Sequence, residues 1–114
     1  MSLKISKRDT GEVTVVDLNG RLTLGDASAQ LRQTLRELLD QGKRKIVLNL
    51  GQVGYIDSSG LGELVSSYTT VKNSGGQLKL AALTDKVNDL LTVTKLYTVF
   101  EIHGDEGAAV KSFS

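Results

Sequence analysis

The fold is decided by residues 46–62, which read IVLNLGQVGYIDSSGLG. The first five of these residues are apolar on both faces of a strand except at Asn49, which is typical of a central strand in a parallel sheet. A glycine-containing loop is expected over residues 51–54, and a helix is expected to begin near Gly60. Strand, loop and helix start in this order are the unit from which α/β sheets are built.

Two strands and a helix are expected before this stretch. Residues 3–7 and 13–18 alternate or are rich in β-branched side chains, and a turn signal between them predicts an antiparallel hairpin. Residues 27–41 change to helical spacing, with leucines along one face. Asp26 is at the expected N-cap of this helix, and Gly42 lies just past its last apolar position.

Helices and strands continue to alternate after the helix that begins near Gly60. The expected positions are residues 60–73, residues 77–82, a helix capped by Thr84, residues 99–102 and residues 106–113. This alternation predicts an α/β fold, formed by a single domain over residues 1–114. We expect a mixed, mostly parallel sheet of four to five strands with about four helices.

Composition favours a binding protein over an enzyme. The chain of 114 residues has 14 Lys plus Arg, 13 Asp plus Glu, one His and no Cys. A net charge of +1 gives no field for holding nucleic acid. Without Cys or a His cluster we expect no metal and no cofactor. A nucleophilic serine would need a base, and the single His103 is expected to be a surface residue.

The distribution of apolar residues predicts a cytoplasmic protein. The longest apolar runs are far short of the roughly 20 residues that span a bilayer, so no direct membrane insertion is expected. The first ten residues also lack the apolar core of a signal peptide.

The functional site is expected where the central strand ends and a helix begins, because ligands and partners bind at the carboxyl ends of such strands. Asp57, Ser58 and Ser59 stand there, followed by Gly60 and Gly62. Each glycine costs a helix nearly 1 kcal/mol relative to Ala but lets another backbone approach closely. A helix N-terminus also suits a phosphate or another anion. The competing interpretation is that one serine only caps the helix, which leaves the other exposed.

The segment from Tyr55 to Gly62, YIDSSGLG, resembles the signature of STAS domains of the anti-sigma factor antagonist (anti-anti-sigma factor) type. These domains belong to bacterial regulators of transcription, and the resemblance extends over nearly the whole chain. The other matching segments are NGRL at 19–22, RKIVLNL at 44–50, SGGQLKL at 74–80, TKL at 94–96 and Val99-Phe100.

The resemblance implies a protein switch. In this family the serine directly after the aspartate, here Ser58, is phosphorylated by an anti-sigma factor that is a serine kinase of the GHKL ATPase class. The unphosphorylated protein binds that kinase, which then releases its sigma factor. The phosphorylated protein no longer binds and is reset by a metal-dependent serine phosphatase. Asp57 would position the acceptor hydroxyl, and Ser59, Gly60 and Gly62 would shape the approach of the partner.

One motif departs from the family pattern. Many relatives carry Gly-Glu-[Leu/Ile]-Asp after the second strand, whereas this chain has Arg21 and Thr23 at the two acidic positions, with Asp26 further along the loop. The residues expected to bind the partner are Asp57, Ser58, Ser59, Gly60, Leu61, Gly62, Thr23 and Asp26. Two other roles of STAS-like domains stay open: a sensor of a small ligand or nucleotide, and an accessory subunit of a membrane lipid-transport complex.

Overall fold

Strands and helices alternate along the chain in the predicted order. The computed structural model describes residues 3–113. The elements are β1 (Lys4–Thr10), β2 (Val13–Leu22), α1 (Asp26–Asp40), β3 (Lys45–Ile56), α2 (Ser58–Asn73), β4 (Gln77–Ala81), α3 (Asp85–Val93), the 3-10 helix η1 (Leu96–Thr98), β5 (Glu101–His103) and α4 (Glu106–Lys111).

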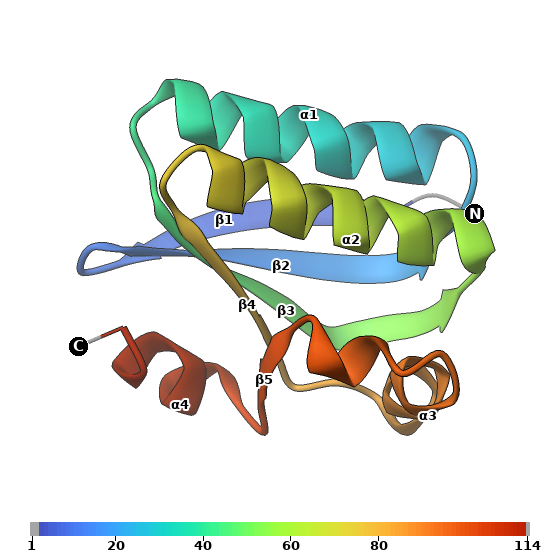
Figure 1. Ribbon diagram of the computed structural model, residues 1–114. Helices are drawn as coiled ribbons and strands as arrows, with labels where there is room; N and C mark the ends of the chain where they lie inside the picture. The colour runs from blue at the N-terminus through green and yellow to red at the C-terminus, as the bar shows by residue number, and fades with distance from the viewer. Residues whose placement is uncertain (1–2, 114) are drawn as a thin grey trace.

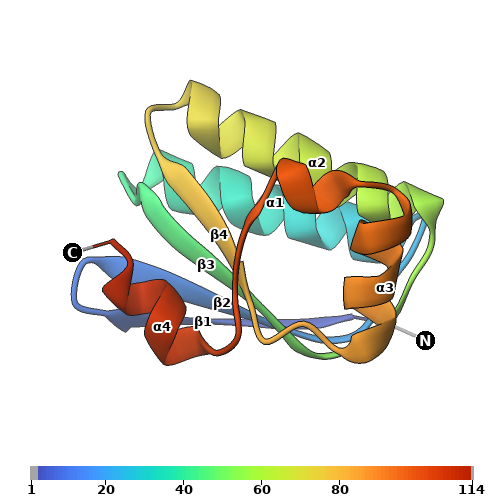
Figure 2. The ribbon, with the colours of Figure 1, turned by 60° about the horizontal axis from the view of Figure 1, so that its bottom comes forward.

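The sheet has five strands in the order β1-β2-β3-β4-β5. β1 pairs antiparallel with β2, and the three remaining pairs are parallel. This confirms the predicted α/β class and the mixed, mostly parallel sheet. Figure 1 shows α1 and α2 together on one face of the sheet, α4 on the opposite face and α3 beside the end of the sheet at which α2 begins. The view in Figure 2 shows the same separation of α4 from α1 and α2.

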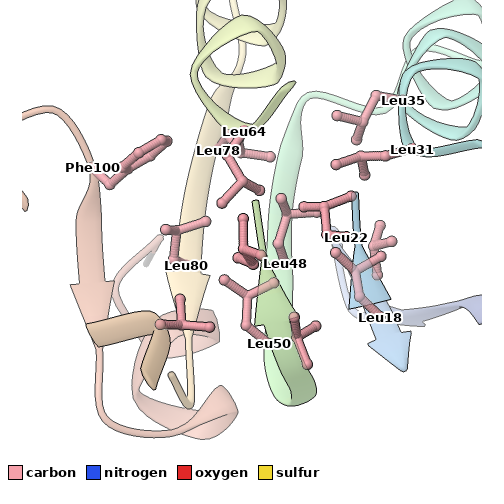
Figure 3. Packing of buried hydrophobic residues seen from close by; sticks show 14 of the residues in the cluster. Leu18, Leu22, Leu31, Leu35, Leu48, Leu50, Leu64, Leu78, Leu80 and Phe100 are labelled. Atoms are coloured by element: carbon pink, nitrogen blue, oxygen red, sulfur yellow. The ribbon is translucent and has the colours of Figure 1, made fainter. Parts of the chain in front are cut away.

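The main core lies between the sheet and the pair α1 and α2. Leu31 and Leu35 from α1 and Leu64 from α2 pack on the leucines of β2, β3 and β4 (Figure 3). Each fully buried side chain of this size stabilises the fold by about 1.5–3 kcal/mol. A smaller cluster under α4 joins Val15 and Val47 to Ala109 on the other face. The two clusters fix the sheet between its helices.

Two capping predictions near the ends of helices are confirmed. Thr84 caps α3, where its hydroxyl oxygen accepts the N–H of Val87 at 3.4 Å. Gly42 follows the end of α1 with a φ of 83°, a left-handed conformation that favours glycine.

The loop predicted over residues 51–54 is wrong, because β3 continues through it to Ile56. β2 also continues past Leu18 to Leu22, and the two strands stay paired up to Leu22 and Ile56. The register of the pairing shifts between Asp17 and Asn19 and again after Gly20, so the two strands stay paired although the pairing is irregular. Tertiary pairing therefore overrides the loop preference of the glycines.

Three predicted boundaries are also wrong. α2 begins at Ser58 and not near Gly60, because Asp57 caps it. The N-cap of α1 is Gly25, with a φ of 96°, so Asp26 is the first helical residue. The last strand is Glu101–His103, since Phe100 turns into the core before the strand begins.

Candidate functional site

The candidate site forms where β2 and β3 end side by side. Leu22 and Ile56 are the last paired residues of these strands, and the chain then turns directly into α2. The N–H of Asp57 donates to the carbonyl oxygen of Leu22 at 3.3 Å, which ties the turn to the neighbouring strand. The starts of α1 and α2 consequently lie next to each other at this edge (Figure 1).

Asp57 joins the start of α2 to the loop between β2 and α1 through both of its carboxylate oxygens. Oδ1 accepts the N–H of Gly60 at 2.7 Å and so caps α2. Oδ2 accepts the N–H of Leu24 at 3.1 Å, in the loop before α1. The bonds from Gly60 and Leu24 hold the pKa of the Asp57 carboxyl below its usual value, because they favour the charged form. Asp57 is therefore an ionised clamp between the loops.

The two glycines of the segment have different surroundings. A Cβ on Gly60 would lie 2.0 Å from the carbonyl oxygen of Leu22 and 2.8 Å from its carbonyl carbon. The close backbone approach that the sequence suggests therefore exists within the chain itself, between α2 and β2. A Cβ on Gly62 would meet nothing within 4 Å, so Gly62 leaves open space on the outside of α2.

Ser58 is the first residue of α2 and is exposed, whereas Ser59 is half-buried. The interpretation that one serine caps the helix is wrong, because the carboxylate of Asp57 has that place. Within residues 3–113 no hydrogen bond of the Ser58 hydroxyl is seen. The hydroxyl thus faces solvent at a fixed helix N-terminus.

The other predicted site residues are placed as follows. Gly60 is buried, and Leu61 is only 8% exposed and packs in the main core. Thr23 is half-buried, and its carbonyl oxygen accepts the hydroxyl of Ser28 at 2.9 Å. Asp26 is exposed in the first turn of α1. The hydrogen bond from Leu24 to Asp57 brings the loop before α1 and the start of α2 to the same edge of the sheet.

Three exposed side chains at this edge were missing from the predicted site. Leu24 is 76% exposed although it is a large apolar residue. Tyr55 is 43% exposed, and the guanidinium carbon of Arg21 lies 4.7 Å from the centre of its ring. In the sequence Arg21 is visible only as a departure from the family motif. Its contact with Tyr55 depends on the pairing of β2 with β3, which the sequence does not show.

Metal ligands, long apolar helices and His103 bear on the other kinds of function. Across residues 3–113 no three His, Cys, Asp or Glu side chains gather to hold a metal ion. None of the helices described is long and apolar enough to cross a membrane. His103 is 21% exposed, with Nε2 2.6 Å from a carboxylate oxygen of Glu101.

The chain thus combines a mixed α/β sheet with an aspartate-capped helix at the ends of its central strands. The chain belongs to the STAS domain family: the family model described as "Mlab, STAS domain" matches residues 5–101.

Curated relatives include the anti-sigma-B factor antagonist of Listeria monocytogenes, which is 31% identical and aligns over 94% of this chain and 92% of its own length. The anti-sigma-B factor antagonist of Bacillus subtilis is 29% identical, over 97% of this chain and 100% of its own length. The crystal structure of a Thermotoga maritima relative superposes with a TM-score of 0.86 at 27% identity, and covers 95% of this chain and 92% of that one.

Proposed function

We propose that this protein is an anti-sigma factor antagonist that works by partner switching. The unphosphorylated form binds an anti-sigma factor that is a serine kinase of the GHKL type, and the kinase then releases its sigma factor. Phosphorylation on Ser58 blocks this binding, and a metal-dependent serine phosphatase resets the protein. The names of the Listeria and Bacillus relatives support the antagonist role. Such a regulator acts in the cytoplasm, where sigma factors direct transcription.

The exposed hydroxyl of Ser58 is the observation that carries this proposal. Ser58 is the first residue of α2. It directly follows the N-cap Asp57, which is held in place by hydrogen bonds from Leu24 and Gly60. A kinase needs an acceptor that is accessible and whose backbone is already ordered, since ordering a flexible segment costs free energy on binding. Ser58 offers both features.

The residues around Ser58 have different roles in the proposed binding. Gly60 and Leu61 act from inside, where they hold α2 against β2 and the core. Gly62 leaves space on the outer side of the helix, so that a partner backbone can approach. The full set proposed to form or shape the partner surface is Asp57, Ser58, Ser59, Gly60, Leu61, Gly62, Thr23 and Asp26.

Phosphorylation is expected to act on the interface and to leave the fold intact. Phosphoserine carries a charge of about −1.5 to −2 at neutral pH. At the N-terminus of α2 this charge is favourable by about 0.3–1 kcal/mol. The ionised Asp57 next to it is a like charge, but both groups stay solvated in the free protein, so their repulsion is screened. In a complex the phosphate would be desolvated against a partner shaped for a hydroxyl, which costs several kcal/mol. The affinity falls while the domain stays folded.

The decisive experiment is to incubate the protein with its purified kinase and ATP and to locate the phosphate by mass spectrometry. We expect phosphate on Ser58, none on Ser58→Ala, and undiminished phosphorylation of the matched Ser59→Ala variant. Phosphate on Ser59, or on no residue, refutes the proposed site.

A parallel pull-down with the wild-type protein and Ser58→Asp tests the switch itself. A kinase captured by the wild type and lost from Ser58→Asp supports the proposal. Capture of a transporter ATPase by both proteins would instead favour the accessory-subunit role. Binding of GTP or ATP in equilibrium dialysis, without a kinase partner, would favour the ligand sensor.

A further inference from the structure

A cation lies over an aromatic ring beside the proposed phosphorylation site. β2 and β3 pair Arg21 with Tyr55, and the guanidinium carbon lies 4.7 Å from the ring centre. Both side chains are exposed, with Tyr55 at 43%. Stacking on the ring orders the arginine before any partner arrives, so less side-chain entropy is lost when it binds a carboxylate.

The charge of Arg21 is not used within the described part of the chain. Arg8 pairs with Asp17, and Arg32 pairs with Glu63. No carboxylate of residues 3–113 forms an ion pair with Arg21. The guanidinium is therefore available to an outside group.

Arg21 and Tyr55 are close to Ser58 through the backbone. Leu22, which follows Arg21, accepts the N–H of Asp57, and Asp57 directly precedes Ser58. Arg21 and Tyr55 directly precede the buried Leu22 and Ile56, so their side chains point to the opposite face of the sheet. A partner that covers the Ser58 hydroxyl meets the pair when it extends around the ends of β2 and β3.

Apolar surface flanks this pair. Beside Tyr55 lies a shallow pocket of about 200 Å³, formed by Tyr55, Ile56, Lys86, Val87 and Leu90. Leu24, at 76% exposure, stands in the loop that Asp57 holds by its backbone. The edge thus combines a pocket for an apolar side chain with two cations, Arg21 and Lys86.

We propose that the kinase which docks over Ser58 presents a carboxylate to Arg21, next to an apolar side chain that fills the pocket beside Tyr55. This inference rests on the proposed function and names the chemistry of its partner. A carboxylate meets the fork of a guanidinium with two hydrogen bonds, which gives direction as well as attraction. A kinase with a cation at that place is repelled, so Arg21 determines which kinase is recognised.

The test uses the kinase captured by the wild-type protein, after identification and purification, in calorimetric titrations at low and high salt. Arg21→Glu is compared with Lys72→Glu, which makes the same charge change. Lys72 is a matched control because its Nζ also lies over a tyrosine, 5.7 Å from the ring centre of Tyr68, but near the other end of α2. Both variants are first shown to melt like the wild type.

We expect Arg21→Glu to weaken binding at least tenfold at low salt and to reduce its salt dependence, because an attraction becomes a repulsion. Lys72→Glu should change the affinity less than twofold. Replacing the facing carboxylate of the kinase by Lys should restore the binding of Arg21→Glu.

The outcomes separate this inference from the proposed function. Equal or tighter binding of Arg21→Glu, together with loss of binding in Ser58→Asp, overturns the Arg21 inference alone. A kinase that binds Ser58→Asp as well as the wild type overturns the proposed function, whatever Arg21→Glu does.

Discussion

Replacing Gly60 by Ala should separate the start of α2 from β2. The added Cβ would stand 2.0 Å from the carbonyl oxygen of Leu22, and this gap must widen to at least 3.0 Å, since real Cβ contacts are essentially never shorter. The obstacle is backbone in a paired strand, so it cannot rotate away as a side chain would. The movement would also pull the N–H of Gly60 from Oδ1 of Asp57, now 2.7 Å away.

The size of the effect follows from two opposed contributions. Overpacking of a fitted contact costs about 1–3 kcal/mol, and a clash with fixed backbone belongs at the upper end. Ala gains about 1 kcal/mol over Gly in a helix. The net loss is about 2 kcal/mol, which lowers the melting temperature by about 8 °C for a domain of this size.

Gly62→Ala is the matched control, because it makes the same change in the same helix. Its Cβ meets nothing within 4 Å, so only the helix gain of about 1 kcal/mol remains. Thermal melts followed by circular dichroism should show Gly60→Ala below the wild type and Gly62→Ala about 4 °C above it. A Gly60→Ala protein that melts at or above the wild-type temperature would refute the account of this contact. If Gly62 leaves room for a partner, its Ala variant should also bind the kinase less tightly.

Three further outcomes are expected. Ser58→Asp should keep the melting temperature within a few degrees of the wild type while it loses the kinase, and a collapse of stability would refute a switch that acts only at the interface. In the folded protein the pKa of Asp57 lies below its unfolded value of 3.8, so its stabilisation is present above about pH 4 and is lost as the pH falls further. Acid denaturation curves of Asp57→Asn should therefore lose less stability below pH 4 than the wild type. Ser67 is buried in α2, and its Oγ has no partner within residues 3–113, so Ser67→Ala should raise the free energy of unfolding by about 1 kcal/mol in urea melts. No gain would indicate that water satisfies the hydroxyl.

Local patterns predicted the order of the elements and the position of the site. Leucine spacing revealed α1, and Thr84 marked the start of α3 because capping is a local property. The same local rules failed over residues 51–54, where glycines indicated a loop and the structure has a strand. The hydrogen-bonding partner of that segment is β2, which is remote in sequence, so no local signal could show it.

The sequence by itself determined that an aspartate, two serines and two glycines stand at the start of a helix in an α/β domain. Tertiary structure alone decided what each of them does. Asp57 caps α2 and reaches Leu24, Gly60 meets Leu22, and Ser58 is left exposed. It also placed Arg21 on Tyr55. The reason is physical: parallel strands are joined by a crossover helix, so their register and the neighbours at their ends are fixed by packing across the sheet and not by adjacent residues.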